Sequence, residues 1–223
     1  PGPATGLPTW TAQGDLMLAI HAGHGEFPRC VMAVSDSQDC FDLMNNAYTI
    51  AETCQTPVII LTDKQIAEAL WTQVPYNQKK AKLNRGMLVT DSAKLAKLEA
   101  GDRYDPTVRS GISYRWLPGA KAATYVAQAD EHSADGSVDE SAENAITQMN
   151  KRMRKLQHMK QSLPEPILYT SKSQIPNPKS QQIDLLIVGW GSVKGPLLDV
   201  LAHPLLQKAK IGYLHYSYLW PMR

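Results

Sequence analysis

The residues best suited to chemistry stand at the start of the chain, in the run GPATGLPTWTAQGDL (residues 2–16). Proline lacks a backbone N–H and glycine loses much conformational entropy in regular structure, so this run is expected to form a loop. Thr9 and Thr11 can each cap the amphipathic helix predicted after them. Backbone N–H groups at a helix N-terminus attract anions. The segment therefore predicts either an anion-binding loop or a tight connector between two elements.

A second glycine-rich run, GWGSVKG at residues 189–195, follows a predicted buried strand. A dinucleotide site would need the spacing Gly-x-Gly-x-x-Gly, but the third glycine of this run comes one residue late. The Gly-x-x-x-x-Gly-Lys-Ser/Thr pattern of a phosphate-binding P-loop is also absent. The run therefore predicts a tight strand-to-helix turn rather than a nucleotide site.

Two histidine-containing groups could belong to catalytic or metal sites. His21 and His24 are close in sequence, but no third ligand stands at the spacing that a metal site requires. They are expected to be surface histidines near a helix C-terminus, where positive charge is favoured. The run Asp130-Glu131-His132 could hold an acid–base pair. Because this run lies in a polar loop, it is expected to form a turn. The sequence assigns a catalytic role to no residue.

Basic residues gather near the end of one predicted helix: Lys151, Arg152, Arg154 and Lys155. They could meet a phosphate, but acids share the helix and the net charge of the chain is only +2. A solvated or subunit-facing surface is the favoured interpretation.

Cys30, Cys40 and Cys54 are too far apart for a cluster or zinc motif, whose paired cysteines are usually about two to four residues apart. The sequence therefore predicts no metal site, and the thiols are expected to be those of a reducing cytosol.

Apolar patterning after the first loop predicts an α/β fold built on a parallel sheet. A helix is expected to end near Gly23, and a further strand–helix–strand–helix unit follows it. The second helix is expected to begin with a capping box at residues 35–38. Its predicted apolar face consists of Phe41, Met44, Tyr48 and Ala51. The predicted elements of the unit are strand 30–34, the helix behind residue 38, strand 58–62 and helix 65–70.

The later sequence divides into a connector and a second α/β unit. Turn signals and weak periodicity predict a long connector over residues 73–178 that lies on the domain body or on a partner. Within it, a capping box at Ser137 and an apolar stripe predict a helix over 138–161. Residues 179–223 then predict the start of a second α/β domain, with strands at 183–188 and 211–219.

The composition excludes several classes of protein. The chain of 223 residues is 43% apolar and 20% charged, which is ordinary for a globular protein with a core. Its charge of +2 gives no reason to expect nucleic-acid or membrane binding. No apolar run reaches the roughly 18–20 residues that span a bilayer, so the chain is expected to be cytoplasmic. Because it begins inside a motif, it is also expected to be a piece of a longer protein.

Five segments together carry a family resemblance. They are GPATGLPTWTAQGDL with HGEFPR at 24–29, GISYRWLPG at 111–119, Asp130–His132, KRMRKL at 151–156, and residues 184–195. In this order they resemble the α subunit of the thiamine-diphosphate-dependent 2-oxoacid:ferredoxin oxidoreductases, especially the 2-oxoglutarate branch. The resemblance covers nearly the whole chain and is specific as a set.

The resemblance implies a fold and an activity. Residues 1–72 would be the C-terminal part of a pyrimidine-binding-type domain, and residues 179–223 would start a domain like the last domain of transketolases. The enzymes decarboxylate a 2-oxoacid on thiamine diphosphate, transfer electrons to ferredoxin and give the acyl group to coenzyme A. A β subunit would hold the diphosphate and its Mg²⁺, and iron–sulfur clusters would lie only on a partner subunit. The residues before Pro1 would include the glutamate that activates the cofactor, so this piece alone is expected to be inactive.

The resemblance also assigns the site residues. Thr5, Gly6, Thr9 and Trp10 would form one rim of the cleft for substrate and cofactor. The family commonly has Arg or Lys where this chain has Trp10, and an indole cannot pair with a substrate carboxylate as a cation can. This departure leaves the 2-oxoacid open. It also keeps a second hypothesis, a non-catalytic α/β scaffold or interaction subunit.

Overall fold

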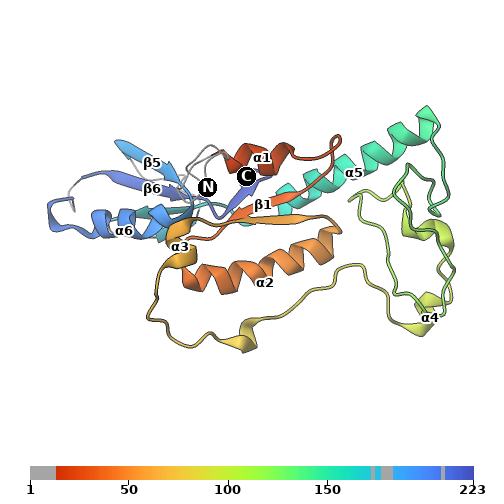
Figure 1. The fold of residues 1–223 in the computed structure, drawn as a ribbon, viewed down its shortest axis with the longest axis horizontal. Helices are drawn as coiled ribbons and strands as arrows, with labels where there is room; N and C mark the ends of the chain where they lie inside the picture. Colours follow the sequence, from red (N-terminus) through yellow and green to blue (C-terminus); the bar gives the residue numbers. More distant parts are fainter. Residues whose placement is uncertain (1–13, 172–173, 177–182, 207–208) are drawn as a thin grey trace.

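The computed structural model describes residues 14–171, 174–176, 183–206 and 209–223, and two small sheets organise them (Figure 1). In the first sheet, β1 (Cys30–Ala33) is the central strand. It pairs in parallel with β2 (Val58–Leu61) and antiparallel with β7 (Tyr218–Trp220). The β1–α2–β2 connection confirms the parallel unit that the apolar patterning predicts.

The first sheet is covered by a helix on each face (Figure 1). Successive side chains of a strand point to opposite faces, so β1 contributes to two cores. Cys30 and Met32 pack with α2 (Ser37–Cys54), whereas Val31 and Ala33 pack with α1 (Asp15–His21). All four β1 residues are buried. The predicted helix end near Gly23 is confirmed, since α1 ends at His21 and Gly23 has a φ of 140°.

The predicted start and apolar face of α2 are both wrong. Asp36 caps the helix by accepting from the Asp39 N–H at 2.8 Å, in place of the predicted box that begins at Ser35. The buried residues of α2 are Leu43, Ala47 and Cys54. Met44 and Tyr48, on the predicted face, are exposed. The helix has apolar residues on two faces, so periodicity alone could not select the one that packs on the sheet. After β2, α3 (Lys64–Glu68) begins with Asp63 as its cap.

The second sheet has the order β4-β3-β6-β5. Its strands are β3 (Ile167–Thr170), β4 (Gln174–Pro176), β5 (Leu185–Gly189) and β6 (Ile211–His215). Strands β5 and β6 are parallel, and the turn η3 (Gly191–Val193), helix α6 (Lys194–Ala202) and turn η4 (Pro204–Leu206) lie between them in the chain. Leu201 of α6 packs on Tyr169 and Tyr213 of the sheet.

The predicted strand over residues 211–219 is divided between the two sheets. Strand β6 stays in the second sheet, and the chain then crosses to the first sheet as β7. The Ala33 N–H donates to the Ser217 carbonyl at 2.9 Å, and Leu219 is buried against the α1 side of the first sheet. This crossing explains the wrong prediction, because an apolar run can continue while the strand changes its pairing partner.

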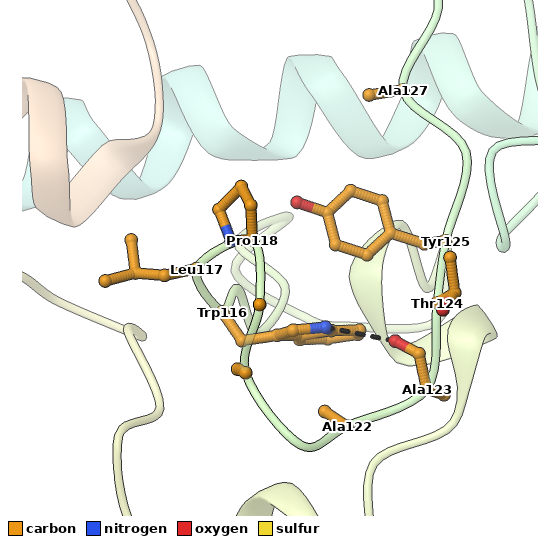
Figure 2. Close-up of a pocket in the computed structure, with 10 residues that line it drawn as sticks. Trp116, Leu117, Pro118, Ala122, Ala123, Thr124, Tyr125 and Ala127 are labelled. Atoms are coloured by element: carbon orange, nitrogen blue, oxygen red, sulfur yellow. Dashed lines mark hydrogen bonds between the residues drawn. The ribbon is translucent and has the colours of Figure 1, made fainter.

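The connector between α3 and β3 folds around a small core of its own. Its short helices are η1 (Gln78–Lys80), α4 (Ser92–Leu95) and η2 (Ala100–Arg103). Val89, Leu95 and Trp116 are buried together, and the indole N–H of Trp116 donates to the Ala123 carbonyl at 3.1 Å (Figure 2). The long helix α5 runs over Ala142–Ser162. It begins four residues later than predicted, because Ser141 provides the cap while Val138 forms a bridge with His132.

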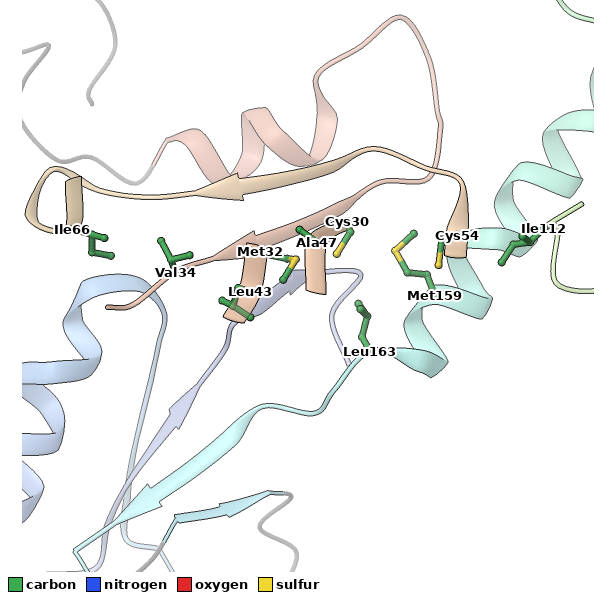
Figure 3. Packing of buried hydrophobic residues seen from close by; sticks show 10 residues of the cluster. All are labelled: Cys30, Met32, Val34, Leu43, Ala47, Cys54, Ile66, Ile112, Met159 and Leu163. Atoms are coloured by element: carbon green, nitrogen blue, oxygen red, sulfur yellow. The ribbon is translucent and has the colours of Figure 1, made fainter. Parts of the chain in front are cut away.

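The largest buried cluster joins α5 to the first sheet. Figure 3 shows Met159 and Leu163 from the end of α5 facing Cys30, Met32 and α2. Met159 is fully buried and Leu163 is 2% exposed, so the helix is attached through its C-terminal end. None of the described helices is long and apolar enough to cross a membrane.

Candidate functional site

Thr5, Gly6, Thr9 and Trp10, the predicted rim of a cofactor cleft, lie outside the described residues. The described residues begin just before α1. The contacts closest to the predicted rim are therefore those of Arg29, which hold α1 in place. Arg29 is 3% exposed, and its Nη1 donates to the Ala19 carbonyl at 3.2 Å and to the Ala22 carbonyl. Its guanidinium also lies 3.8 Å from the centroid of the Phe27 ring. A buried cation thus satisfies the carbonyls at the C-terminal end of α1 and fixes the helix on the sheet.

The carboxyl ends of the parallel strands in the two sheets meet at one polar cluster. In open α/β folds, ligands bind outside these strand ends, and short polar loops follow them. Here residues that follow β1 and β2 contact residues that follow β5. We call the joining residues the cross-sheet cluster: Asp36, Asp39, Asp63, Ser192 and Lys194.

Lys194 carries the charge contacts of the cross-sheet cluster. Its Nζ lies 3.1 Å from Asp36 Oδ2 and 3.5 Å from Asp39 Oδ2, and the lysine side chain is only 16% exposed. Lys194 is the first residue of α6, whereas both aspartates stand at the start of α2. The Ser35 hydroxyl also donates to Asp39. The contact therefore ties the N-termini of two helices that belong to different sheets.

The pKa values of this pair follow from burial and opposite charge. Burial alone would raise the pKa of Asp36, but the Asp39 N–H and Lys194 outweigh it and hold that pKa below its usual value. Burial alone would lower the pKa of Lys194, but Asp39 and Asp36 outweigh it and raise that pKa. Each group thus favours the charged form of the other.

Asp63 makes the second connection between the sheets. Its Oδ1 accepts from the Ile66 N–H at 3.0 Å and caps α3, while its Oδ2 accepts from the Ser192 N–H at 3.3 Å. Gly191 has a φ of 76°, which favours glycine. The glycine-rich run is therefore a tight turn between β5 and α6, as predicted, and the Ser192 N–H within it contacts the Asp63 carboxylate.

Beside this cluster, two side chains of β6 form a buried polar pair. The Tyr213 hydroxyl lies 2.8 Å from His215 Nδ1, and both residues are almost wholly buried. Burial, followed by the charge of Lys194, lowers the pKa of His215 to about 4. Burial raises the pKa of Tyr213 to about 12. Both groups are therefore neutral at pH 7, and His215 Nε2 is a buried atom without a partner.

The predicted solvated or subunit-facing surface at residues 151–155 is wrong, because these side chains contact the connector and the C-terminal end of α2. Lys151 is 7% exposed. Lys155 donates to the Gln55 carbonyl at 2.9 Å. Arg154 donates to the carbonyls of Pro106 and Val108. Gly111 has a φ of 73°, and a Cβ there would lie 2.4 Å from the Lys151 carbonyl oxygen. The connector backbone therefore contacts the helix too closely for any side chain at that position.

The turn predicted at Asp130–His132 lies slightly later, at residues 134–135, where His132 bridges Val138, and the contacts of the run itself are structural. Glu131 pairs with Arg152 through oxygen–nitrogen distances of 2.5 and 3.1 Å. The Arg152 hydrogen bond is the main reason that the pKa of Glu131 lies below its usual value. The His132 ring lies 4.2 Å from the Tyr104 ring, between centroids. The sequence showed both charged groups but not their pairing across 21 residues.

The described residues offer no metal site. Within them, no three His, Cys, Asp or Glu side chains stand close enough to hold an ion. The three cysteines are free, and burial raises the pKa of Cys30 to about 12. His21 is exposed in the last turn of α1, as predicted. Sequence reasoning missed the cross-sheet cluster, although Asp36 and Asp63 each follow a predicted strand closely, which is a usable signal for that edge.

Comparison with known proteins begins with a family model. Residues 1–152 match the model of a family described as pyruvate flavodoxin/ferredoxin oxidoreductase, thiamine diphosphate-binding. The matched range includes the N-terminal run of residues 2–16, the first sheet up to β2, the connector as far as α5 and half of α5.

Individual relatives agree with that match. Over 207 residues the chain is 38% identical to subunit alpha of 2-oxoacid:ferredoxin oxidoreductase 1 from Sulfurisphaera tokodaii, covering 90% of this chain and 30% of the relative. Over 225 residues it is 28% identical to subunit KorA of a 2-oxoglutarate oxidoreductase from Mycobacterium tuberculosis, covering 99% of this chain and 31% of the relative. The chain therefore spans about a third of the length of these relatives.

A solved structure has the same fold. A 2-oxoglutarate:ferredoxin oxidoreductase from Magnetococcus marinus matches with a TM-score of 0.84 and 28% identity, over 99% of this chain and 36% of the other. That protein is described with 2-oxoglutarate, coenzyme A and succinyl-CoA bound. The match includes both sheets, so their arrangement is shared with that structure.

Proposed function

The chain belongs to the thiamine-diphosphate-binding family of pyruvate flavodoxin/ferredoxin oxidoreductases, and from that premise we propose that it is part of an α subunit that oxidises a 2-oxoacid to an acyl-CoA. The observation that carries the proposal is the family match over residues 1–152, which contain the GPATGLPTWTAQ loop. The 2-oxoglutarate oxidoreductases among the relatives favour 2-oxoglutarate as the substrate.

The cofactor and partners follow as part of the same proposal. Thiamine diphosphate would lie between this subunit and a β subunit, with Thr5, Gly6, Thr9 and Trp10 at the rim of the cleft. By resemblance, a β subunit would hold the diphosphate and Mg²⁺. Iron–sulfur clusters would lie on a partner, ferredoxin would accept the electrons, and the complex would be cytoplasmic.

The second sheet would belong to a further domain of the proposed subunit. We assign the region of residues 179–223 to the start of a domain like the last domain of transketolases. Its parallel β5–α6–β6 unit supports this assignment, and β3 and β4 extend its sheet. The cross-sheet cluster would then set the orientation of that domain relative to the pyrimidine-binding-type domain.

The test of this function is substrate selectivity in the complete enzyme. We expect Trp10→Arg, in the α subunit reconstituted with its β subunit, to increase the kcat/KM ratio of 2-oxoglutarate to pyruvate. A charge-assisted hydrogen bond to a carboxylate contributes about 1.5–3 kcal/mol, which corresponds to roughly a ten- to hundredfold change in the ratio. Trp10→Gln, which adds polar groups without charge, is the matched control.

The result separates the two hypotheses for the chain. A selectivity change with Arg and not with Gln places the loop beside the substrate. An unchanged ratio in a well-folded Trp10→Arg enzyme means that the loop does not face the substrate. Absence of 2-oxoacid oxidation in the reconstituted wild-type complex would favour the scaffold or interaction subunit instead. The 223-residue chain by itself should reduce no viologen dye with 2-oxoglutarate and coenzyme A, because the proposed site needs both subunits.

A further inference from the structure

An open cavity of about 350 Å³ lies on α5 beside the Arg154 contacts described above, and every residue that lines it has a polar side chain. The six residues around it are Arg109, Ser110, Arg154, Gln157, His158 and Gln161. None of them is acidic and none is aliphatic. We call this cavity the α5 pocket. Two guanidinium groups in one small cavity favour a ligand that carries negative charge and several acceptor oxygens.

The arginines of the α5 pocket have different roles. The Arg154 guanidinium is held by the carbonyls of Pro106 and Val108. Arg109 is exposed, and no described residue accepts a hydrogen bond from it or pairs with it. The Ser110 hydroxyl accepts from the Ile112 N–H at 3.2 Å, so its own proton is available for a ligand. One arginine is thus positioned in advance, and the other is free to bind.

Buried cations stand on the adjoining face of the same helix. The pocket residues of α5 recur at spacings of three and four, as one face of a helix does, and Lys151 and Lys155 occupy the next face inward. Together with Arg103 they form the α5 cation cluster. Arg103 and Lys155 both donate to Gln55, at 3.3 and 2.9 Å, and Lys151 lies 5.8 Å from the centroid of the Tyr104 ring.

The α5 cation cluster lacks a matching set of carboxylates. The side-chain amine of Lys151 makes no hydrogen bond within the described residues, and Arg103 Nε is a buried atom without a partner. The charge of Asp105 acts to raise the pKa of Lys151, but its Oδ1 already accepts from Thr107 at 2.7 and 2.8 Å. Glu131 is paired with Arg152. Positive charge on this side of α5 therefore exceeds negative charge, which strengthens the attraction of the α5 pocket for an anion.

We propose that the α5 pocket binds a phosphate group, with Arg109 and Arg154 as its principal contacts and Ser110 as an additional donor. A cavity of this size is at the small end of the range for ligand sites, so it accommodates inorganic phosphate or a small phosphate monoester. The proposal does not rest on the proposed oxidoreductase function, and no residue of the proposed cofactor rim takes part in it.

The experiment titrates the 223-residue chain with inorganic phosphate, methyl phosphate and acetate at low ionic strength, by calorimetry and ³¹P NMR. We expect saturable binding of one phosphate per chain. Arg109→Gln should weaken it about tenfold or more, because a charge-assisted hydrogen bond is lost. Gln157→Glu should abolish it by placing a carboxylate in the pocket. Lys97→Gln, an exposed substitution outside the pocket, is the charge-matched control and should bind as the wild type does.

Each outcome is informative. Tighter binding of methyl phosphate than of inorganic phosphate identifies a monoester as the ligand type, and the reverse order identifies free phosphate. The proposal is overturned if binding is not saturable, if acetate binds as well as phosphate, or if Gln157→Glu leaves the affinity unchanged. Arg109 and Gln157 are both exposed, so circular dichroism is expected to show the wild-type fold for both variants.

Discussion

Lys194 and Lys151 are both largely removed from water, yet the protein treats their charges in opposite ways. Lys194 stands between Asp36 and Asp39, and these carboxylates raise its pKa despite its burial. Lys151 stands beside Lys155 and Arg103, and burial lowers its pKa to about 7. Burial disfavours both ammonium ions, so the carboxylates decide the difference. One buried lysine, Lys194, can therefore stay charged and connect two sheets. Another, Lys151, can be about half neutral at physiological pH.

The largest expected effect comes from removing each charge in turn. Lys194→Met should destabilise the fold by about 2–3 kcal/mol, because it leaves Asp36 and Asp39 poorly hydrated without their cation. Lys151→Met should be neutral or stabilising, because it removes an amine that has no carboxylate partner. Urea unfolding measures both, with Lys97→Met as the exposed control. Equal destabilisation by the two substitutions would contradict the comparison.

The second effect is the pH dependence of stability, which should come from Lys151 and not from Lys194. The folded pKa of Lys151 is about 7 and its ordinary value is 10.5, so between these pH values the unfolded chain binds the extra proton. Stability from this group therefore rises with pH from about 7 to about 10, by at most about 1.4 kcal/mol per unit. Lys155, whose pKa is about 8, adds a smaller total increase in stability over a narrower pH range.

Lys194 has the opposite sign. Its folded pKa is raised, so its stabilisation is fully present below 10.5 and is lost as pH rises through the folded value. Asp36 has a lowered pKa, and its stabilisation is present above 3.8 and lost as pH falls. Urea unfolding at pH 7, 8 and 9 tests this, and Lys151→Met should remove most of the slope while Lys194→Met keeps it. A slope unchanged by Lys151→Met would show that this amine is not the titrating group.

The sequence predicted the secondary-structure elements that carry these lysines better than it predicted the contacts between those elements. The β1–α2–β2 unit and the turn at Gly189–Gly195 followed from apolar runs and glycine positions, which are local signals. The ion pair between Lys194 and Asp36 joins residues 158 positions apart, and no local pattern encodes it. The charge run at 151–155 predicted a solvated or subunit-facing surface. Nothing in the sequence around Lys151 indicates that Gly111, 40 residues earlier, lets the connector pack against it. The assignment of Thr5, Gly6, Thr9 and Trp10 to the rim of a cleft still depends on the family resemblance alone, because these residues lie outside the described part of the chain.

The third prediction measures the other contact between the sheets. Asp63→Ala removes the cap of α3 and the acceptor of the Ser192 N–H, whereas Asp91→Ala removes only the cap of α4. An N-cap contributes about 1 kcal/mol. We expect Asp63→Ala to cost about 1 kcal/mol more than Asp91→Ala, since it also leaves a backbone N–H without its partner. Equal losses of unfolding free energy would mean that the Asp63–Ser192 contact contributes nothing to joining the sheets.

The smallest expected effect belongs to Glu131 and Arg152, a pair that has carboxylate and cation but keeps contact with water. The Arg152 side chain is 30% exposed, against 16% for Lys194, so solvent screens this cation more. A double-mutant cycle with Glu131→Gln and Arg152→Gln should give a coupling of about 0.5–1 kcal/mol at pH 7. Because the pKa of Glu131 is lowered, this coupling should be present above its ordinary value of 4.5 and disappear as pH falls below it. A coupling as large as that of Lys194 with Asp36 would show that exposure matters less here than geometry, since the Glu131 contact is bidentate.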